Sequence, residues 1–101
     1  MSDVSCTHVE QIREVTPSAQ GCEECLKMGD GWVHLRICLI CGHVGCCDNS
    51  KNKHATKHFH ATHHAIIQSF EPREYWIWCY LDHVAMELGH KLYTDDHSAR
   101  K

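Results

Sequence analysis

The stretch Cys38–His64, CLICGHVGCCDNSKNKHATKHFHATHH, decides how this chain folds. It holds four of the eight cysteines and six of the eleven histidines. Cys38 and Cys41 form a Cys-x2-Cys pair, whose two intervening residues let the backbone turn and aim both sulfurs at one ion. Thiolate and neutral imidazole are ligands that Zn²⁺ prefers. The stretch is therefore predicted to fold around zinc, with the rest of the chain completing the sites.

Length and composition predict one small domain that needs metal. The chain has 101 residues, and its hydrophobic fraction of 43% includes the eight cysteines, so the remaining core is thin. The formal charge of −3 argues against a nucleic-acid partner. The sequence shows no signal peptide and no apolar run of about 20 residues, so neither secretion nor a membrane is expected. We expect a cytoplasmic monomer, in a compartment where cysteines bind metal rather than form disulfides.

Two further groups of potential ligands precede the central stretch. Cys22 and Cys25 form a second Cys-x2-Cys pair, separated from Cys38 by twelve residues. Two such pairs in one cytosolic chain are a strong zinc signal. Near the N-terminus, Cys6-Thr7-His8 is a weaker signal on its own.

Hydrophobic alternation predicts three strands and one helix. A strand is expected over 32–37, a helix over 53–62 and further strands over 65–70 and 75–81. A tight turn is expected around Val44, and 83–88 is left open as strand or short helix. The zinc domain is expected to span residues 1–88, with a frayed polar tail over 89–101.

Alternation also assigns faces to two of these strands. In the first strand the inward residues would be Val33, Leu35 and Ile37, and the opposite face would be Trp32, His34 and Arg36. In the third, Tyr75, Ile77, Cys79 and Leu81 would share one face, with Trp76, Trp78 and Tyr80 on the other. The second face of each strand is either a solvated surface or part of a binding groove.

Counting ligands gives three sites of four. The candidates are Cys6, His8, Cys22, Cys25, Cys38, Cys41, Cys46, His54, His58, His64 and Cys79, with Asp82 as the twelfth. Asp82 is included because it stands where a second knuckle cysteine would follow Cys79, and carboxylate oxygen binds zinc. Spacing alone leaves the pairing open. The two knuckles could share one four-cysteine site, or each could begin its own.

The order Cys-x-His, Cys-x2-Cys, Cys-x2-Cys-Gly, Cys, His-x3-His, His, Trp-Cys-x2 resembles the UBP-type zinc finger. This module occurs in deubiquitinases and in one class of histone deacetylase, and the resemblance extends from Cys6 to Asp82. It implies an α+β fold, in which a small twisted antiparallel sheet with one or two flanking helices is stabilised by two to three interleaved zinc ions.

The resemblance also implies how the ligands pair. One site would join Cys6, His8, Cys79 and Asp82; a second Cys22, Cys25, Cys46 and His54; a third Cys38, Cys41, His58 and His64. Two positions depart from the family pattern. Asp82 stands where cysteine is more common, and Cys47 stands where glycine is usual, which makes Cys47 a spare thiol. His63 is an alternative to its neighbour His64.

Family members that bind ubiquitin hold its free Gly-Gly tail in an aromatic pocket, where an arginine meets the terminal carboxylate. Here Asp48-Asn49 stands where those binders have Arg-Tyr, and Arg36 stands where they have tryptophan. Trp78 and Tyr80 match the pocket aromatics. The resemblance therefore implies a pocket without its family anion anchor, and we expect no family-type binding of the ubiquitin tail.

Two functions of different class follow. The first is a stand-alone zinc-binding module for a peptide or protein, with a recognition surface of Trp32, His34, Arg36, Trp76, Trp78 and Tyr80. The alternative is a zinc-dependent hydrolase centred on the Cys6/His8/Cys79/Asp82 site. A binding module is preferred because a catalytic zinc needs an open coordination position, which twelve ligands for three ions do not leave.

Overall fold

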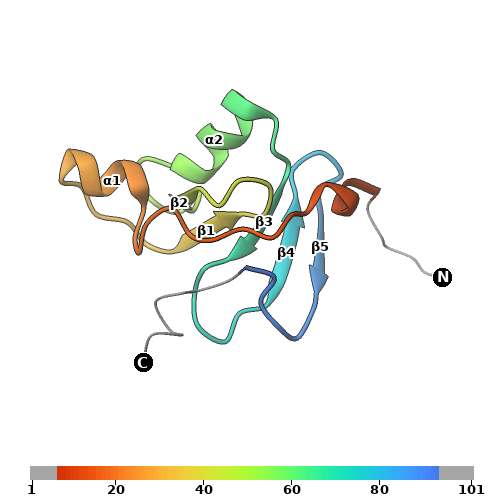
Figure 1. Ribbon diagram of the computed structural model, residues 1–101. Coiled ribbons are helices and arrows are strands. Elements are labelled where there is room, and N and C mark those ends of the chain that lie inside the picture. Colours follow the sequence, from red (N-terminus) through yellow and green to blue (C-terminus); the bar gives the residue numbers. More distant parts are fainter. Residues whose placement is uncertain (1–6, 94–101) are drawn as a thin grey trace.

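The computed structural model describes residues 7–93 and has the expected α+β fold. Its elements are η1 (Thr7–Gln11), α1 (Glu23–Met28), β1 (Leu35–Cys38), β2 (Val44–Cys46), α2 (His54–Thr62), β3 (Ile66–Ser69), β4 (Trp76–Cys79) and β5 (Val84–Glu87). The strands form one antiparallel sheet in the order β2-β1-β3-β4-β5. Figure 1 shows α1 and α2 gathered at the β2 end of the sheet.

Strand β4 shows the alternation that the sequence predicts. Ile77 and Cys79 are buried, whereas Trp76 and Trp78 are half-buried and lie on the other face. The segment left open between strand and helix is strand β5, because Val84–Glu87 pairs antiparallel with β4 and closes that edge of the sheet.

Three local predictions are wrong. The first strand begins at Leu35 rather than at residue 32, so Val33 lies outside the ladder and is 53% exposed. Val44 is part of β2 rather than of a turn, because it pairs with Ile37. Leu81 lies beyond the end of β4 and is 52% exposed, since the alternation stops with the strand.

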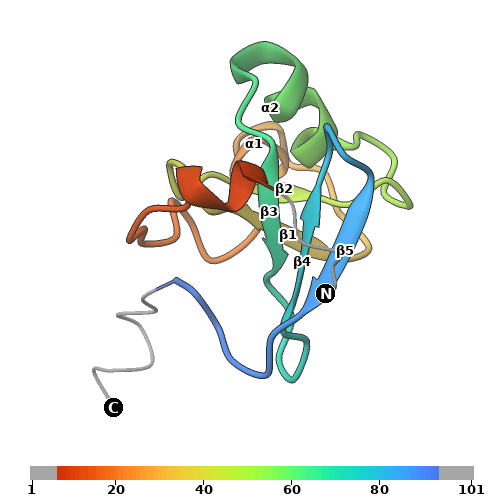
Figure 2. The same cartoon turned by 90° about the vertical axis from the view of Figure 1, so that its right-hand side faces the viewer.

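The core lies between one face of the sheet and the N-terminal segment. Ile37, Ile66 and Ile77 from three strands are at most 2% exposed, and Val15 joins their cluster. Figures 1 and 2 show the N-terminal segment crossing this face of the sheet before α1. Arg13 N donates to Leu39 O over 2.9 Å, which ties that segment to the end of β1.

The chain after Gly89 is also anchored, as far as it is described. The buried Gln68 donates from Nε2 to the carbonyl oxygens of Tyr75 and His90, and its Oε1 accepts from Leu92 N. Leu92 and Tyr93 pack against the core. The prediction of a frayed tail is therefore wrong for residues 89–93, and residues 94–101 lie outside the described part.

Close packing at one glycine brings α2 onto the sheet. A Cβ built at Gly45 would lie 2.7 Å from the backbone N of Ala55 in α2. A side chain there would push the helix away from β2, so glycine permits the close approach. This contact sets the height of α2 over Cys46 and therefore the position of its histidines.

Candidate functional site

The first metal cluster joins Cys22, Cys25, Cys46 and His54, whose ligand atoms all lie within 4.8 Å of one another. His54 Nδ1 is 3.2, 3.5 and 3.6 Å from the sulfurs of Cys22, Cys25 and Cys46 in turn. A tetrahedron with zinc–sulfur bonds of about 2.3 Å has edges of roughly 3.8 Å. The arrangement therefore fits one tetrahedral ion.

Three elements position this cluster. Cys22 is the N-cap of α1, and its Sγ accepts a hydrogen bond from Cys25 N at 3.5 Å. The Cys22/Cys25 pair therefore forms the start of the helix. Cys46 ends β2, and its Sγ accepts from His54 N at 3.2 Å, where α2 begins. Helix α1 was not predicted from the sequence, because its six residues are too few for a visible apolar period.

The second cluster joins Cys38, Cys41, His58 and His64. Cys41 Sγ lies 3.3 Å from His58 Nε2. His64 Nδ1 is buried and has no hydrogen-bond partner. A buried polar nitrogen without a partner costs free energy unless something binds it. A metal ion among these ligands would remove that cost, so the donor set fits zinc.

His63, the alternative to His64, is exposed and lies outside the cluster. It is the C-cap of α2 in the left-handed conformation, with φ of 64°, and its N–H donates to Phe59 O. This reversal at the helix end directs the next residue, His64, back toward the knuckle.

Burial keeps side chains of the two clusters uncharged in the absence of a cation. Burial raises the pKa of the Cys22 thiol to about 12 and that of Cys38 to about 11. Burial likewise lowers the pKa of His58 to about 4, so its imidazole is neutral at pH 7 and able to bind a metal. A bound Zn²⁺ reverses the penalty on the thiolates, because its charge outweighs the loss of solvation.

The third cluster joins His8, Cys79 and Asp82. His8 Nδ1 lies 3.0 Å from Asp82 Oδ2 and 3.5 Å from Cys79 Sγ. Its predicted fourth member, Cys6, lies outside the described residues. All other predicted ligands are thus grouped as the resemblance implies. That these individual residues hold the ions stays a prediction, as does the hydrolase alternative at this third cluster.

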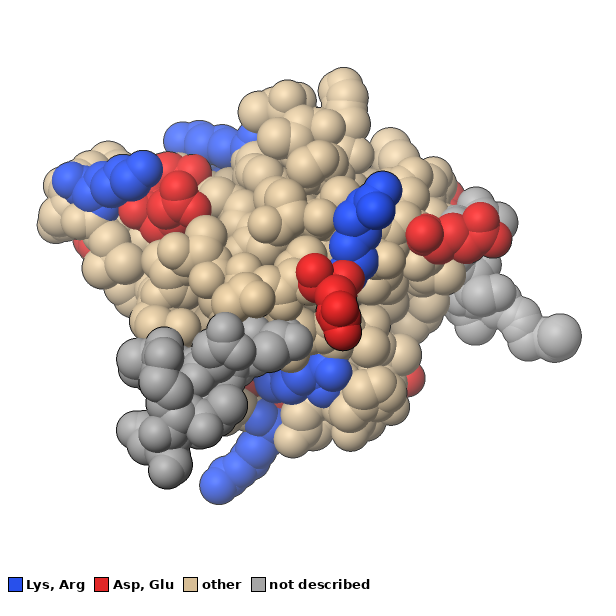
Figure 3. Space-filling view, in the orientation of Figure 1, with Lys and Arg blue, Asp and Glu red and all other residues tan. Residues whose placement is uncertain are grey.

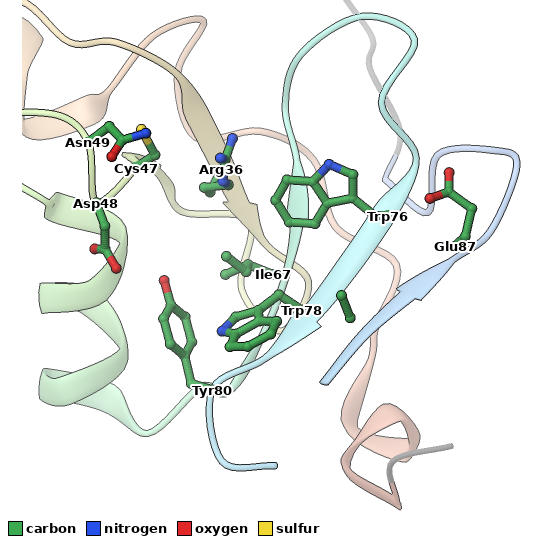
Figure 4. A pocket seen from close by; sticks show the side chains of 10 residues that line it. Arg36, Cys47, Asp48, Asn49, Ile67, Trp76, Trp78, Tyr80 and Glu87 are labelled. Atoms are coloured by element: carbon green, nitrogen blue, oxygen red, sulfur yellow. The ribbon is translucent and has the colours of Figure 1, made fainter. Parts of the chain in front are cut away.

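A pocket of about 550 Å³ opens on the face of the sheet opposite the core. It is lined by Arg36, Cys47, Asp48, Asn49, Ile67, Trp76, Trp78, Tyr80, Ala85 and Glu87. Figure 4 shows Asp48 and Tyr80 on one side of the pocket and Trp76 and Glu87 on the other, with Arg36 between Cys47 and Trp76. The Arg36 guanidinium lies 4.6 Å from the centre of the Trp76 ring. Aromatic faces from β4 thus meet charges of both signs.

Trp32, which the sequence analysis placed on the recognition surface, is not part of this pocket lining. Because β1 begins only at Leu35, Trp32 does not share the face of Arg36. It packs against the core instead, and a Cβ at Gly21 would meet its ring at 2.6 Å. His34 is exposed and also does not line the pocket.

The thiol of Cys47 lines the pocket and lies outside the metal clusters of the described residues. Burial acts to raise its pKa, but hydrogen bonds with Ser50, Asn49 and His34 and the charge of Arg36 outweigh burial. The pKa therefore lies below the usual thiol value.

A contact that the sequence reasoning missed links the first two clusters. His43 Nε2 lies 2.8 and 2.9 Å from the two carboxylate oxygens of Glu24 on α1. The His43 ring stacks on the ring of His58, with centroids 4.1 Å apart and planes 8° from parallel. Glu24 therefore supports a predicted zinc ligand through His43. The only signal in the sequence was the place of His43 directly after the Cys-x2-Cys-Gly knuckle.

We expect Glu24→Ala to lower the zinc affinity of the second cluster about tenfold. Loss of a residue that holds a metal ligand in place typically lowers metal affinity by about 10- to 100-fold, and this expectation is at the low end of that range. The reason is that His43 would lose the carboxylate that holds its ring against His58. Competition with a coloured chelator measures the affinity. Glu23→Ala is the matched control, because Glu23 pairs with Lys27 at 3.6 Å. Equal effects of the two variants would contradict this role for Glu24.

The helices and the surface charges concern two classes of partner, membranes and nucleic acids. None of the described helices is long and apolar enough to cross a membrane. On the described part of the face in Figure 3, Lys and Arg are interspersed with Asp and Glu and separated by uncharged surface. That face offers no continuous cationic surface of the kind that phosphate backbones favour.

Residues 22–91 match the family described as "Zn-finger in ubiquitin-hydrolases and other protein". The chain is 40% identical over 70 residues to human ubiquitin carboxyl-terminal hydrolase 45, covering 58% of this chain and 8% of that protein. It is 38% identical over 75 residues to the human and mouse BRCA1-associated protein, covering 73% of this chain and 12% of each relative. The chain thus spans about a tenth of the length of these curated relatives.

A solved structure resembles nearly the whole chain. It is the solution NMR structure of a protein from Rhodopseudomonas palustris, with 59% sequence identity and a TM-score of 0.83. The match covers 92% of this chain and 91% of that one. The chain therefore belongs to the UBP-type zinc-finger family and is a zinc-binding module.

Proposed function

We propose that this module binds a peptide or protein segment in the pocket between β4 and the loop at Asp48. The observation that carries the proposal is the set of aromatic side chains, Trp76, Trp78 and Tyr80, half-buried around a cavity of about 550 Å³. Half-buried aromatics in a concave site supply contact area at low conformational cost. We propose further that it acts as a cytoplasmic monomer.

The hydrogen bonds near Asp48 in the pocket favour a ligand that donates hydrogen bonds. Thr56 Oγ1 donates to Asp48 Oδ1 at 2.6 Å, which uses its single hydrogen. Tyr80 Oη lies 3.3 Å from Thr56 Oγ1, so the Tyr80 hydroxyl is left to donate to Thr56. Burial raises the pKa of Tyr80, which keeps that hydroxyl protonated. Asp48 and Tyr80 therefore present acceptor lone pairs.

Arg36 has contacts of its own within the pocket. Arg36 is engaged by the Trp76 face and by Leu35 O, to which its Nη1 donates at 3.0 Å. Asp48 occupies the place that the resemblance gives to the arginine of ubiquitin-tail binders. This supports a ligand that is neutral or basic at Asp48, rather than a free carboxylate.

The test of binding is capture of partners on the immobilised zinc-loaded protein, with Trp78→Ala as the variant. Trp78 lines the pocket, and its loss removes a large contact area without touching a metal cluster. Leu81→Ala is the matched control, because Leu81 is 52% exposed and does not line the pocket. Partners should be retained by the parent and by Leu81→Ala and lost from Trp78→Ala. Identical capture by all three would refute the pocket as the binding site.

A separate titration tests the preference against the ubiquitin tail. The lost arginine pairing alone is worth about 1.5–3 kcal/mol, or roughly ten- to hundredfold in affinity. We expect no change of amide shifts around Trp78 when free ubiquitin is added at micromolar concentration. Saturable shifts there would overturn this preference but leave the pocket as a peptide site.

A further inference from the structure

A second cavity adjoins the proposed pocket. It has a volume of about 420 Å³ and shares Asp48, Trp78 and Tyr80 with the first cavity. Its remaining lining residues are Thr56, Phe59, His60 and His83. Because Asp48, Trp78 and Tyr80 line both cavities, the two cavities lie side by side, within reach of one bound peptide. We call the two cavities together the groove.

The two cavities differ in charge. The first contains Arg36 and Glu87 in addition to Asp48, whereas Asp48 is the only Asp, Glu, Lys or Arg among the described residues that line the second. One oxygen of Asp48 accepts from Thr56, which leaves the other for a ligand. No lysine or arginine of the described lining competes for it.

The walls of the second cavity are aromatic. Phe59 and Tyr80 stack with centroids 4.7 Å apart and planes 10° from parallel. The imidazole of His83 meets Trp78 edge to face at 5.9 Å. Aromatic faces beside a carboxylate attract cations, because the ring quadrupole is negative on its face.

We propose that the second cavity receives the cationic side chain, lysine or arginine, of the peptide bound in the groove. The proposal rests on the proposed peptide binding and adds to it the chemical class of one ligand residue. The cation would lie between Asp48 and the rings of Trp78 and Tyr80. A neutral side chain can donate hydrogen bonds to the oxygens of Asp48 and Tyr80, but it gains no attraction from the charge of the Asp48 carboxylate.

The probes are N-acetyl-arginine amide and its neutral near-isostere N-acetyl-citrulline amide. Each is titrated at millimolar concentration into zinc-loaded ¹⁵N-labelled protein, and shifts are followed at the Trp78 indole and at the amides of Asp48 and His83. The arginine probe should bind about fivefold more tightly, as expected for an exposed cation–π contact with one ion pair. Raising the salt concentration should reduce that difference.

Two variants test whether Asp48 causes the preference for the arginine probe. Asp48→Asn should bring the arginine probe to the affinity of the citrulline probe, whereas Glu87→Gln should keep the difference, because Glu87 lines only the first cavity. Both residues are exposed, so both variants should fold, and their amide spectra verify this. Equal affinities of the two probes, or a preference unchanged in Asp48→Asn, would overturn the proposal.

The outcomes separate this proposal from the one on which it rests. If both probes shift Trp78 equally, the groove binds peptide-like ligands without reading charge, and only the cation site is wrong. If neither probe shifts Trp78 or its neighbours, the cation site is wrong, and the capture comparison of Trp78→Ala with Leu81→Ala decides the peptide site independently.

Discussion

A chelator strong enough to remove zinc is expected to unfold the domain. Cys22, Cys25 and Cys46 belong to the hydrophobic core cluster and are all 0% exposed, so the first metal cluster is continuous with the core. Binding energy at a structural zinc site is folding energy, on the order of 10 kcal/mol per site at neutral pH. Two or three such sites together exceed the net stability of about 5–15 kcal/mol that is typical of a folded domain.

The measurement is the amide spectrum before and after treatment, with metal content determined on the same sample. We expect loss of dispersion on removal and recovery on adding zinc. Full dispersion in protein shown to be free of metal would contradict a structural role for zinc.

Cys22→Ser is expected to unfold the domain, whereas Asp82→Ala should leave its centre folded. Cys22 is fully buried, starts α1 and lies 3.2 Å from His54 Nδ1, so its loss opens a cluster that joins α1, β2 and α2. The side chain of Asp82 is 41% exposed and belongs to the cluster between the ends of the chain. Metal analysis should show at most one ion lost from Asp82→Ala.

Cys47→Ala is the matched control, since it removes a buried thiol that lies outside the clusters. It should bind as much zinc as the parent protein. A lower zinc content in this variant would shift the predicted ligand from Cys46 to Cys47. Similar stability of Cys22→Ser and Asp82→Ala would show that the assignment of sites is wrong.

Residue type and spacing were sufficient for the use of zinc, because knuckle geometry is local. The family and the fold class followed from the resemblance that the order of the ligands bears to the UBP-type zinc finger. Two residues between cysteines aim both sulfurs at one point whatever surrounds them. The same holds for the alternation of β4, where a period of two separates Trp76 and Trp78 from Ile77 and Cys79. Local patterns of this kind can be recognised in the sequence without knowing which residues pack against them.

Tertiary structure decided what depends on neighbours distant in sequence. The alternation over 32–37 looks like one strand, but the ladder begins at Leu35, so Trp32 joins the core and leaves the recognition surface. The support of His58 by Glu24 through His43 requires α1 and the knuckle turn to meet in space. The second cavity exists because α2 brings Phe59 onto Tyr80, and no period in the sequence encodes that contact. Spacing fixes local geometry, whereas a groove between a helix and a sheet depends on packing that only the folded chain specifies.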